Sequence, residues 1–204
     1  MEGSYLLSQG FEVFIDPRLE VYGEEHFILY MNAISDVQSW EKTIDDYEVE
    51  VILVDLRSRV INFALQSRKW SLAYFDEVAA VFLPTNYHDQ GILLSGNKGL
   101  TKNIEQLRRS LPIIDSFKPN GILDSALSPE PYMRVADLLL VLNHPMQALA
   151  FLRDAENIAF DPIPVWQKQG TIFNKTDDFP SAIRVYEAIL SSKPDHGDAL
   201  YKLS

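Results

Sequence analysis

Apolar runs between Met1 and Pro84 predict strands at four places. Residues 11–15 (FEVFI) end at Asp16-Pro17, where proline stops a strand, and Val51–Val54 is continuously apolar, as in a strand covered on both faces. Two further runs, Trp70–Phe75 and Val78–Leu83, flank Asp76-Glu77. Such a pair of runs around a two-residue turn predicts a β-hairpin.

Apolar residues at helical spacing predict three helices in the same segment. The first is expected over Glu24–Ile34. The second follows the capping pair Ser35-Asp36 and has Trp40, Ile44 and Tyr47 on one face. The third is a short helix around Val60, Phe63 and Ala64. The order strand, helices, strand, helix, hairpin predicts a small mixed α/β domain over residues 1–84. Its central strands are expected to be parallel and its edge antiparallel.

Residues 85–129 have the composition of a connector. Thr85–Gln90 is polar and rich in turn residues, and prolines interrupt the segment repeatedly. Ile104, Leu107 and Leu111 fall on one helical face. We expect one or two short helices here.

Residues 130–204 match themselves at a period of 34. The pairs in register include Tyr132 with Trp166 and Leu200, Ala136 with Gly170, Leu139 with Phe173, Ala148 with Ala182, and Leu152 with Tyr186. This period and order of aromatic and small residues resemble the tetratricopeptide repeat, an array of antiparallel helix pairs. The chain departs from that pattern at Gln169, Pro145 and Phe160, where leucine, tyrosine and proline are usual.

The resemblance implies two helix pairs and the start of a third, in which Gly170 and Ala182 allow helices to approach closely. The fold class expected for the whole chain is therefore α/β plus all-α. Tetratricopeptide arrays bind peptides on the face lined by the first helix of each pair. The positions that correspond to this groove are Met133, Asp137, Leu140, Gln167, Thr171, Asn174 and Tyr201. A face that is merely solvated remains the alternative.

Charge is uneven along the chain. The 204 residues carry 18 basic and 29 acidic side chains, a formal charge of −11. Residues 1–50 alone hold twelve of the acids and two of the bases. This balance argues against nucleic-acid binding and against an anionic membrane surface. No apolar stretch approaches the length of about 20 residues that spans a bilayer, so no membrane insertion is expected within this chain.

A short pattern, apolar strand followed by Asp-x-Arg, occurs twice, in FIDPR and in LVDLR. If both strands were parallel neighbours, Asp16, Arg18, Asp55 and Arg57 would share the sheet edge where open α/β folds bind ligands. We therefore treat them as a candidate polar pocket. The alternative is structural: an Asp and an Arg two residues apart commonly pair with each other or cap a helix.

The residues needed for independent catalysis are missing from the sequence. There is no cysteine and no GxSxG serine motif, and the four histidines have no metal-ligand spacing. No glycine-rich phosphate loop follows a predicted strand. Neighbouring arginines would keep Asp16 and Asp55 ionised, which removes a general acid. We expect no catalytic, metal-binding or cofactor-binding residues.

The first half also resembles a known family. GSYLL at Gly3–Leu7, VFIDPRLEVYGEE at Val13–Glu25, Trp40, YEVEVILVD at Tyr47–Asp55 and WSLAYFDEVAAVFL at Trp70–Leu83 carry this resemblance. They are similar to the extracytoplasmic domain that follows the last membrane helix in bacterial polytopic glycosyltransferase-like proteins. These are relatives of the lipid-phosphate-mannose mannosyltransferases, and some end in tetratricopeptide repeats.

This second resemblance implies a non-catalytic soluble module, with membrane helices upstream of Met1 and the catalytic carboxylates between those helices. The module would lie outside the cytoplasmic membrane and bind a protein or peptide through its repeats. Two alternatives stay open at this point: a free-standing cytoplasmic tetratricopeptide adaptor, and a small-molecule-binding α/β domain that uses the Asp-x-Arg residues.

Overall fold

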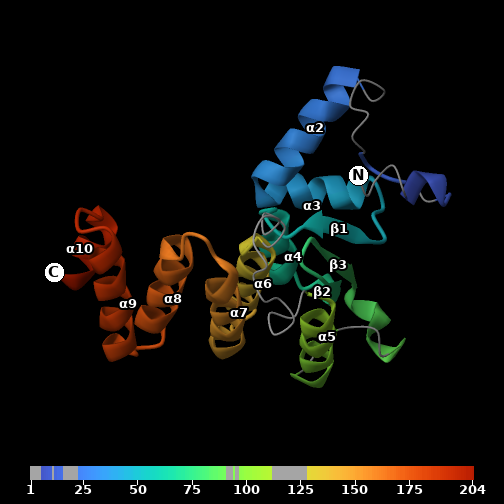
Figure 1. The fold of residues 1–204 in the computed structure, drawn as a ribbon. Helices are drawn as coiled ribbons and strands as arrows, with labels where there is room; N and C mark the ends of the chain where they lie inside the picture. Colours follow the sequence, from blue (N-terminus) through green and yellow to red (C-terminus); the bar gives the residue numbers. More distant parts are fainter. Residues whose placement is uncertain (1–5, 11, 16–22, 91–93, 95–96, 112–127) are drawn as a thin grey trace. The chain divides into compact units, whose positions relative to one another are not determined.

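The computed structural model describes residues 6–10, 12–15, 23–90, 94, 97–111 and 128–204 (Figure 1). The first elements are the helices α2 (Gly23–Ser35) and α3 (Val37–Asp46), β1 (Ile52–Asp55), α4 (Val60–Gln66), β2 (Trp70–Phe75), β3 (Ala79–Pro84) and a 3-10 helix, η2 (Thr85–Gln90). They are followed by α5 (Asn97–Ser110), α6 (Glu130–Val141), α7 (Pro145–Ile158), α8 (Ile163–Lys175), α9 (Phe179–Ser192) and α10 (Gly197–Leu203). No helix in these ranges combines the length and the apolar character needed to cross a bilayer. The residues that the structure describes are thus mostly helical with one small antiparallel sheet, which is compatible with the α/β plus all-α fold class.

Contacts within the chain divide it into two compact units. The first comprises Met1–Val54, Ser58–Ala73 and Val81–Leu93, and the second comprises Asp55–Arg57, Tyr74–Ala80 and Leu94–Ser204. The units interleave along the sequence, whereas the predicted domains, 1–84, 85–129 and 130–204, are consecutive stretches. The end of β1 and the tip of the hairpin therefore belong to the same unit as the C-terminal helices.

Helix α3 in the first unit begins where the sequence predicts. The Asp36 carboxylate accepts a hydrogen bond from the Ser39 backbone N–H (2.8 Å), which satisfies one of the free amides of the first turn. Trp40 is buried, and its ring lies 6.0 Å from that of Phe63 on α4. Tyr47 does not share the buried face, because it follows the last turn and is about half exposed. The amphipathic spacing therefore predicts where the helix lies but extends it past its last residue, Asp46.

The three strands form an antiparallel sheet in the order β1-β3-β2. The predicted hairpin is confirmed, but its loop is one residue longer than expected, because β3 begins at Ala79. The Asp76 carboxylate accepts hydrogen bonds from the backbone N–H groups of Val78 and Ala79 (2.8 Å each). The Asp76 backbone N–H also donates to the Ala79 carbonyl (3.0 Å), so the side chain and the main chain of Asp76 close the loop together.

Three expectations about the sheet are wrong. Residues 12–15 are not a strand, and the sheet is not mixed, because β1 pairs antiparallel with β3. The Phe14 carbonyl instead accepts a hydrogen bond from His26 Nε2 (2.6 Å), and the Phe14 ring packs against His26 and Tyr47. β1 is also not covered on both faces, since Leu53 is exposed. An apolar run alone could not distinguish these cases.

Helix α5, in the second unit, is longer than the short helices expected of a connector. Its predicted apolar face, Ile104, Leu107 and Leu111, is buried. The Asn103 side-chain amide donates a hydrogen bond to the Phe75 carbonyl at the hairpin (2.8 Å). Arg108 pairs with Asp154 of α7 and lies 5.5 Å from the centre of the Phe151 ring. These bonds attach α5 both to the hairpin tip and to the first pair of C-terminal helices.

Helices α6 to α10 follow one another at a regular interval. Extensive contacts join α6 with α7 and α8 with α9. The second helices of these pairs, which begin at Pro145 and Phe179, are separated by one full period of the sequence repeat, and so are the starts of α8 and α10. The paired alanines Ala148 and Ala182 are both buried, as the period requires. The helix spacing thus repeats the spacing of the sequence.

Helices α8 and α9 pack so closely at Gly170 that there is no space for a side chain. A Cβ atom added there would lie 2.7 Å from Cζ and 2.9 Å from Cε1 of Tyr186. Tyr186 is itself buried, and with Ala182, Ile189 and Ala199 it forms the apolar core between α9 and α10. The ring therefore occupies the space that any side chain at position 170 would need.

We predict that Gly170→Ala lowers the free energy of unfolding by about 1–2 kcal/mol. Overpacking against the buried Tyr186 ring outweighs the gain in helix propensity from alanine. Gly197→Ala is the matched control, since a Cβ there meets nothing within 4 Å. Urea unfolding of both variants checks the prediction. An equally stable Gly170→Ala protein would mean that the ring moves away at little cost.

Candidate functional site

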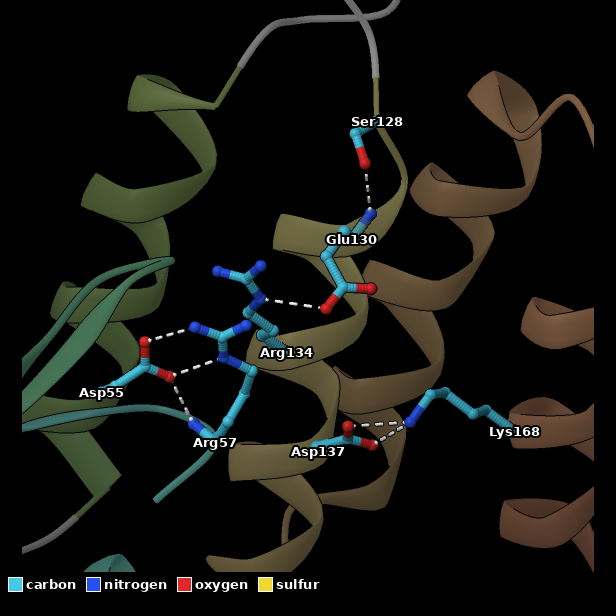
Figure 2. A network of polar contacts seen from close by, with 7 residues as sticks. All are labelled: Asp55, Arg57, Ser128, Glu130, Arg134, Asp137 and Lys168. Atoms are coloured by element: carbon cyan, nitrogen blue, oxygen red, sulfur yellow. Dashed lines mark hydrogen bonds and ion pairs between the residues drawn. The ribbon is translucent and has the colours of Figure 1, made fainter.

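Asp55 is the last residue of β1, Arg57 lies two residues after it, and the two side chains bind each other (Figure 2). Arg57 Nε and Nη2 donate to the two carboxylate oxygens of Asp55, at 2.9 and 2.8 Å, and the Arg57 backbone N–H donates to Oδ1 at 2.8 Å. This is a bidentate pair with a third bond from the main chain, the geometry in which guanidinium and carboxylate match best. The Asp-x-Arg spacing at this copy therefore closes a local turn.

The charge state of Asp55 follows from that geometry. The hydrogen bonds and the charge of Arg57, together with the nearby charge of Arg134, lower the pKa of Asp55 from its usual value to about 2. Asp55 correspondingly raises the pKa of Arg57. Arg134 is in turn paired with Glu130 of the same helix (3.0 Å), as Figure 2 shows. An ionised carboxylate held by three donors cannot serve as a general acid near neutral pH.

The other copy of the pattern, Asp16 and Arg18, lies outside the described residues. The reason for grouping it with Asp55 and Arg57 was a pair of parallel strands, and the antiparallel sheet removes that reason. The four-residue pocket stays a prediction. What the geometry supports at Asp55 and Arg57 is the structural alternative, in which the two residues pair with each other.

The predicted groove residues lie on the first helices of the repeats. Met133, Asp137 and Leu140 are on α6, Gln167, Thr171 and Asn174 are on α8, and Tyr201 is on α10. Their exposure differs: Tyr201 is 75% exposed, whereas Leu140 and Asn174 are partly buried. The Asn174 amide donates to the Tyr186 hydroxyl (3.3 Å), so it also supports the packing of α8 on α9.

An ion pair joins two of the helices that carry the predicted groove residues. Lys168 Nζ of α8 lies 2.6 and 2.7 Å from the carboxylate oxygens of Asp137 on α6 (Figure 2). Lys168 was not among the predicted groove residues. The 34-residue period places Thr171 at the position that corresponds to Asp137, and Lys168 lies one helical turn before Thr171. The sequence repeat therefore contained a signal by which Lys168 could have been found. The pair neutralises the acidic side chain that this surface would otherwise present.

A second polar contact joins the successive helix pairs. The Glu156 carboxylate of α7 accepts a hydrogen bond from the Trp166 indole (2.7 Å) and another from the Gln169 amide (2.9 Å), both on α8. Gln169 is buried, and it stands where tetratricopeptide repeats usually have leucine. The departure is therefore compensated, since a buried amide needs a partner and Glu156 supplies it.

The described residues contain no group of three or more His, Asp or Glu side chains that could hold a metal ion. A shallow depression in the first unit is lined by Ile44, Asp45, Lys69 and Trp70, among others. Its Asp45 and Lys69 side chains form an ion pair with each other (2.8 Å), so their charges are engaged within the depression.

We predict that Glu156→Leu lowers the free energy of unfolding by about 1–3 kcal/mol, because it leaves the buried Gln169 amide unsatisfied. Adding Gln169→Leu should return part of that loss, since leucine needs no hydrogen-bond partner. Urea unfolding followed by tryptophan fluorescence measures both variants. Glu187→Leu, on an exposed position of α9, is the control and should change stability by less than about 0.5 kcal/mol. Equal losses in the single and double variants would show that the amide contact is not coupled to Glu156.

Comparison with known proteins assigns neither a family nor a function to this chain. No protein-family model, no curated protein and no solved structure matches the chain. The functional argument therefore rests on the residues and on their arrangement.

Proposed function

We propose that helices α6 to α10 form a tetratricopeptide-like surface that binds a protein or peptide, and that this chain catalyses no reaction by itself. The observation that carries the proposal is the recurrence of packed helix pairs at the period of the sequence repeat. The close packing of Tyr186 on Gly170 supports it, because that contact explains why the repeat needs a small residue there. Arrays of this kind present a continuous face made of their first helices.

The chemistry of the predicted groove indicates the kind of partner. Its charged side chains Asp137 and Lys168 pair with each other, so the groove offers little net charge. The remaining groove positions are amide, hydroxyl, aromatic and aliphatic side chains. We infer that the partner is an extended peptide segment held by hydrogen bonds and apolar contacts. Such binding depends only weakly on ionic strength.

The resemblance of the first half extends this proposal to the parent protein. We propose that the chain is the soluble region of a membrane glycosyltransferase-like protein and lies outside the cytoplasmic membrane. The support is the order of motifs from Gly3 to Leu83. The second candidate is a free-standing soluble adaptor, for which the repeat array is equally suited.

The groove can be tested with a displayed library of random peptides of about 12 residues, a length that spans such a surface. We expect selected peptides to bind Gln167→Ala/Tyr201→Ala about tenfold more weakly, because both side chains line the predicted groove. Met146→Ala is the control, since Met146 is 67% exposed on α7, a second helix.

Methionine methyl NMR supplies a readout that needs no substitution. The four methionines include Met133 in the groove and Met146 outside it. A selected peptide should shift the Met133 signal and leave Met146 unchanged. Peptides that bind both variants equally and leave Met133 unshifted would contradict the groove assignment.

Cell fractionation tests the proposed parent protein. With antibody to this chain, we expect a band well above 23.3 kDa in the membrane fraction of the source organism, because membrane helices would precede Met1. A soluble band near 23.3 kDa would instead favour the free-standing adaptor. Detergent extraction of the membrane fraction is the control, since it separates an integral protein from one that merely adheres.

A further inference from the structure

Helix α2 is apolar on two opposite sides. Ala33 is buried on the side that packs with α3. Phe27, Ile28 and Met31 lie on the other side, since each is more than a quarter turn from Ala33 at about 100° per residue. They are 37%, 49% and 42% exposed. A helix with apolar residues on both sides is typical of an element that is covered on both.

The three exposed side chains form one stripe. Phe27 and Met31 are four residues apart, so they are neighbours on the helix surface, and Ile28 lies beside them. A stripe of this spacing is what one helix presents when a second helix packs along it. Isolated exposed apolar residues need no explanation, but three adjacent ones on one face indicate a contact surface.

The charge around this stripe indicates what covers it. Glu24 lies on the same stripe, one turn before Phe27 and Ile28, and Glu25 is next to it; both are exposed. Acidic residues at this end would repel an anionic membrane and a second copy packed in parallel, and they would attract a cationic partner.

We propose that Phe27, Ile28 and Met31 on α2 form a docking surface for a basic amphipathic helix of another protein. The apolar face of the partner covers the three side chains, and its lysine or arginine residues lie beside Glu24 and Glu25. This surface belongs to α2 and is separate from the repeat groove, so it does not depend on the proposed function.

The test uses a fluorescent amphipathic peptide of leucine and lysine, about 14 residues long, titrated into the full chain. We expect Ile28→Ser/Met31→Ser to weaken binding about tenfold, because the apolar contact is lost. Met146→Ser, an exposed methionine on α7, is the matched control and should bind as the unaltered chain does. Glu24→Gln/Glu25→Gln should weaken binding and reduce its dependence on salt.

Methionine methyl NMR of the unaltered chain keeps the test independent of how the variants fold. The peptide should shift the Met31 signal and leave Met133 and Met146 in place. A shift at Met133 instead would place the peptide in the repeat groove and overturn the α2 site while leaving the proposed function standing.

Four other results would also overturn the proposal. One is equal binding by Ile28→Ser/Met31→Ser, and another is equal binding of a leucine–glutamate peptide with the same leucine positions. A third is binding of the unaltered chain, but not of Ile28→Ser/Met31→Ser, to phosphatidylcholine vesicles, which would identify a membrane face. The fourth is a dimer that the same substitutions dissociate, which would identify a second copy as the occupant.

Discussion

The contact between the Tyr186 ring and the backbone at Gly170 is the constraint on which the C-terminal helices depend. A buried ring placed where no Cβ fits fixes both the distance between α8 and α9 and their rotation. The same ring belongs to the buried cluster of Ala182, Ile189 and Ala199. The packing of α10, which contributes Ala199, therefore depends on the position of this ring. Losing the contact would therefore affect three helices together.

Polar contacts then connect one helix pair to the next. Apolar packing is not directional, whereas hydrogen bonds and ion pairs select one register. Arg108 with Asp154 connects α5 to α7, Glu156 with Trp166 and Gln169 connects α7 to α8, and Asp137 with Lys168 connects α6 to α8. Each of these contacts joins elements that the apolar pattern alone would allow to slide.

The two candidate surfaces differ in their electrostatics. In the predicted groove, the charges of Asp137 and Lys168 cancel each other at short range, which favours a partner held by shape and hydrogen bonds. On α2, the exposed Glu24 and Glu25 lie at the end of the apolar stripe, which favours a cationic partner. If both proposals hold, the two surfaces bind partners of different chemistry.

The sequence by itself determined the helices, the hairpin and the 34-residue repeat. Those features follow from local spacing and capping: Asp36 caps α3, and Ile104, Leu107 and Leu111 define the buried face of α5. It also predicted a close approach at Gly170. Each of these signals lies within a single element or recurs at one fixed period.

Only the tertiary structure decided which strands pair and which polar side chains meet. The run at residues 11–15 has strand composition, yet the carbonyl of Phe14 bonds to His26, twelve residues away. The sequence left Asp55 with two interpretations, a shared pocket and the more common local pair, and the structure shows Arg57 bound to it. The shared pocket with Asp16 and Arg18 stays a prediction. Nothing in the sequence distinguishes Glu156 from other acidic residues. Its role is visible only because the fold places Gln169 beside it. The physical reason is that hydrogen-bond partners distant along the chain are chosen by packing, which local periodicity does not encode.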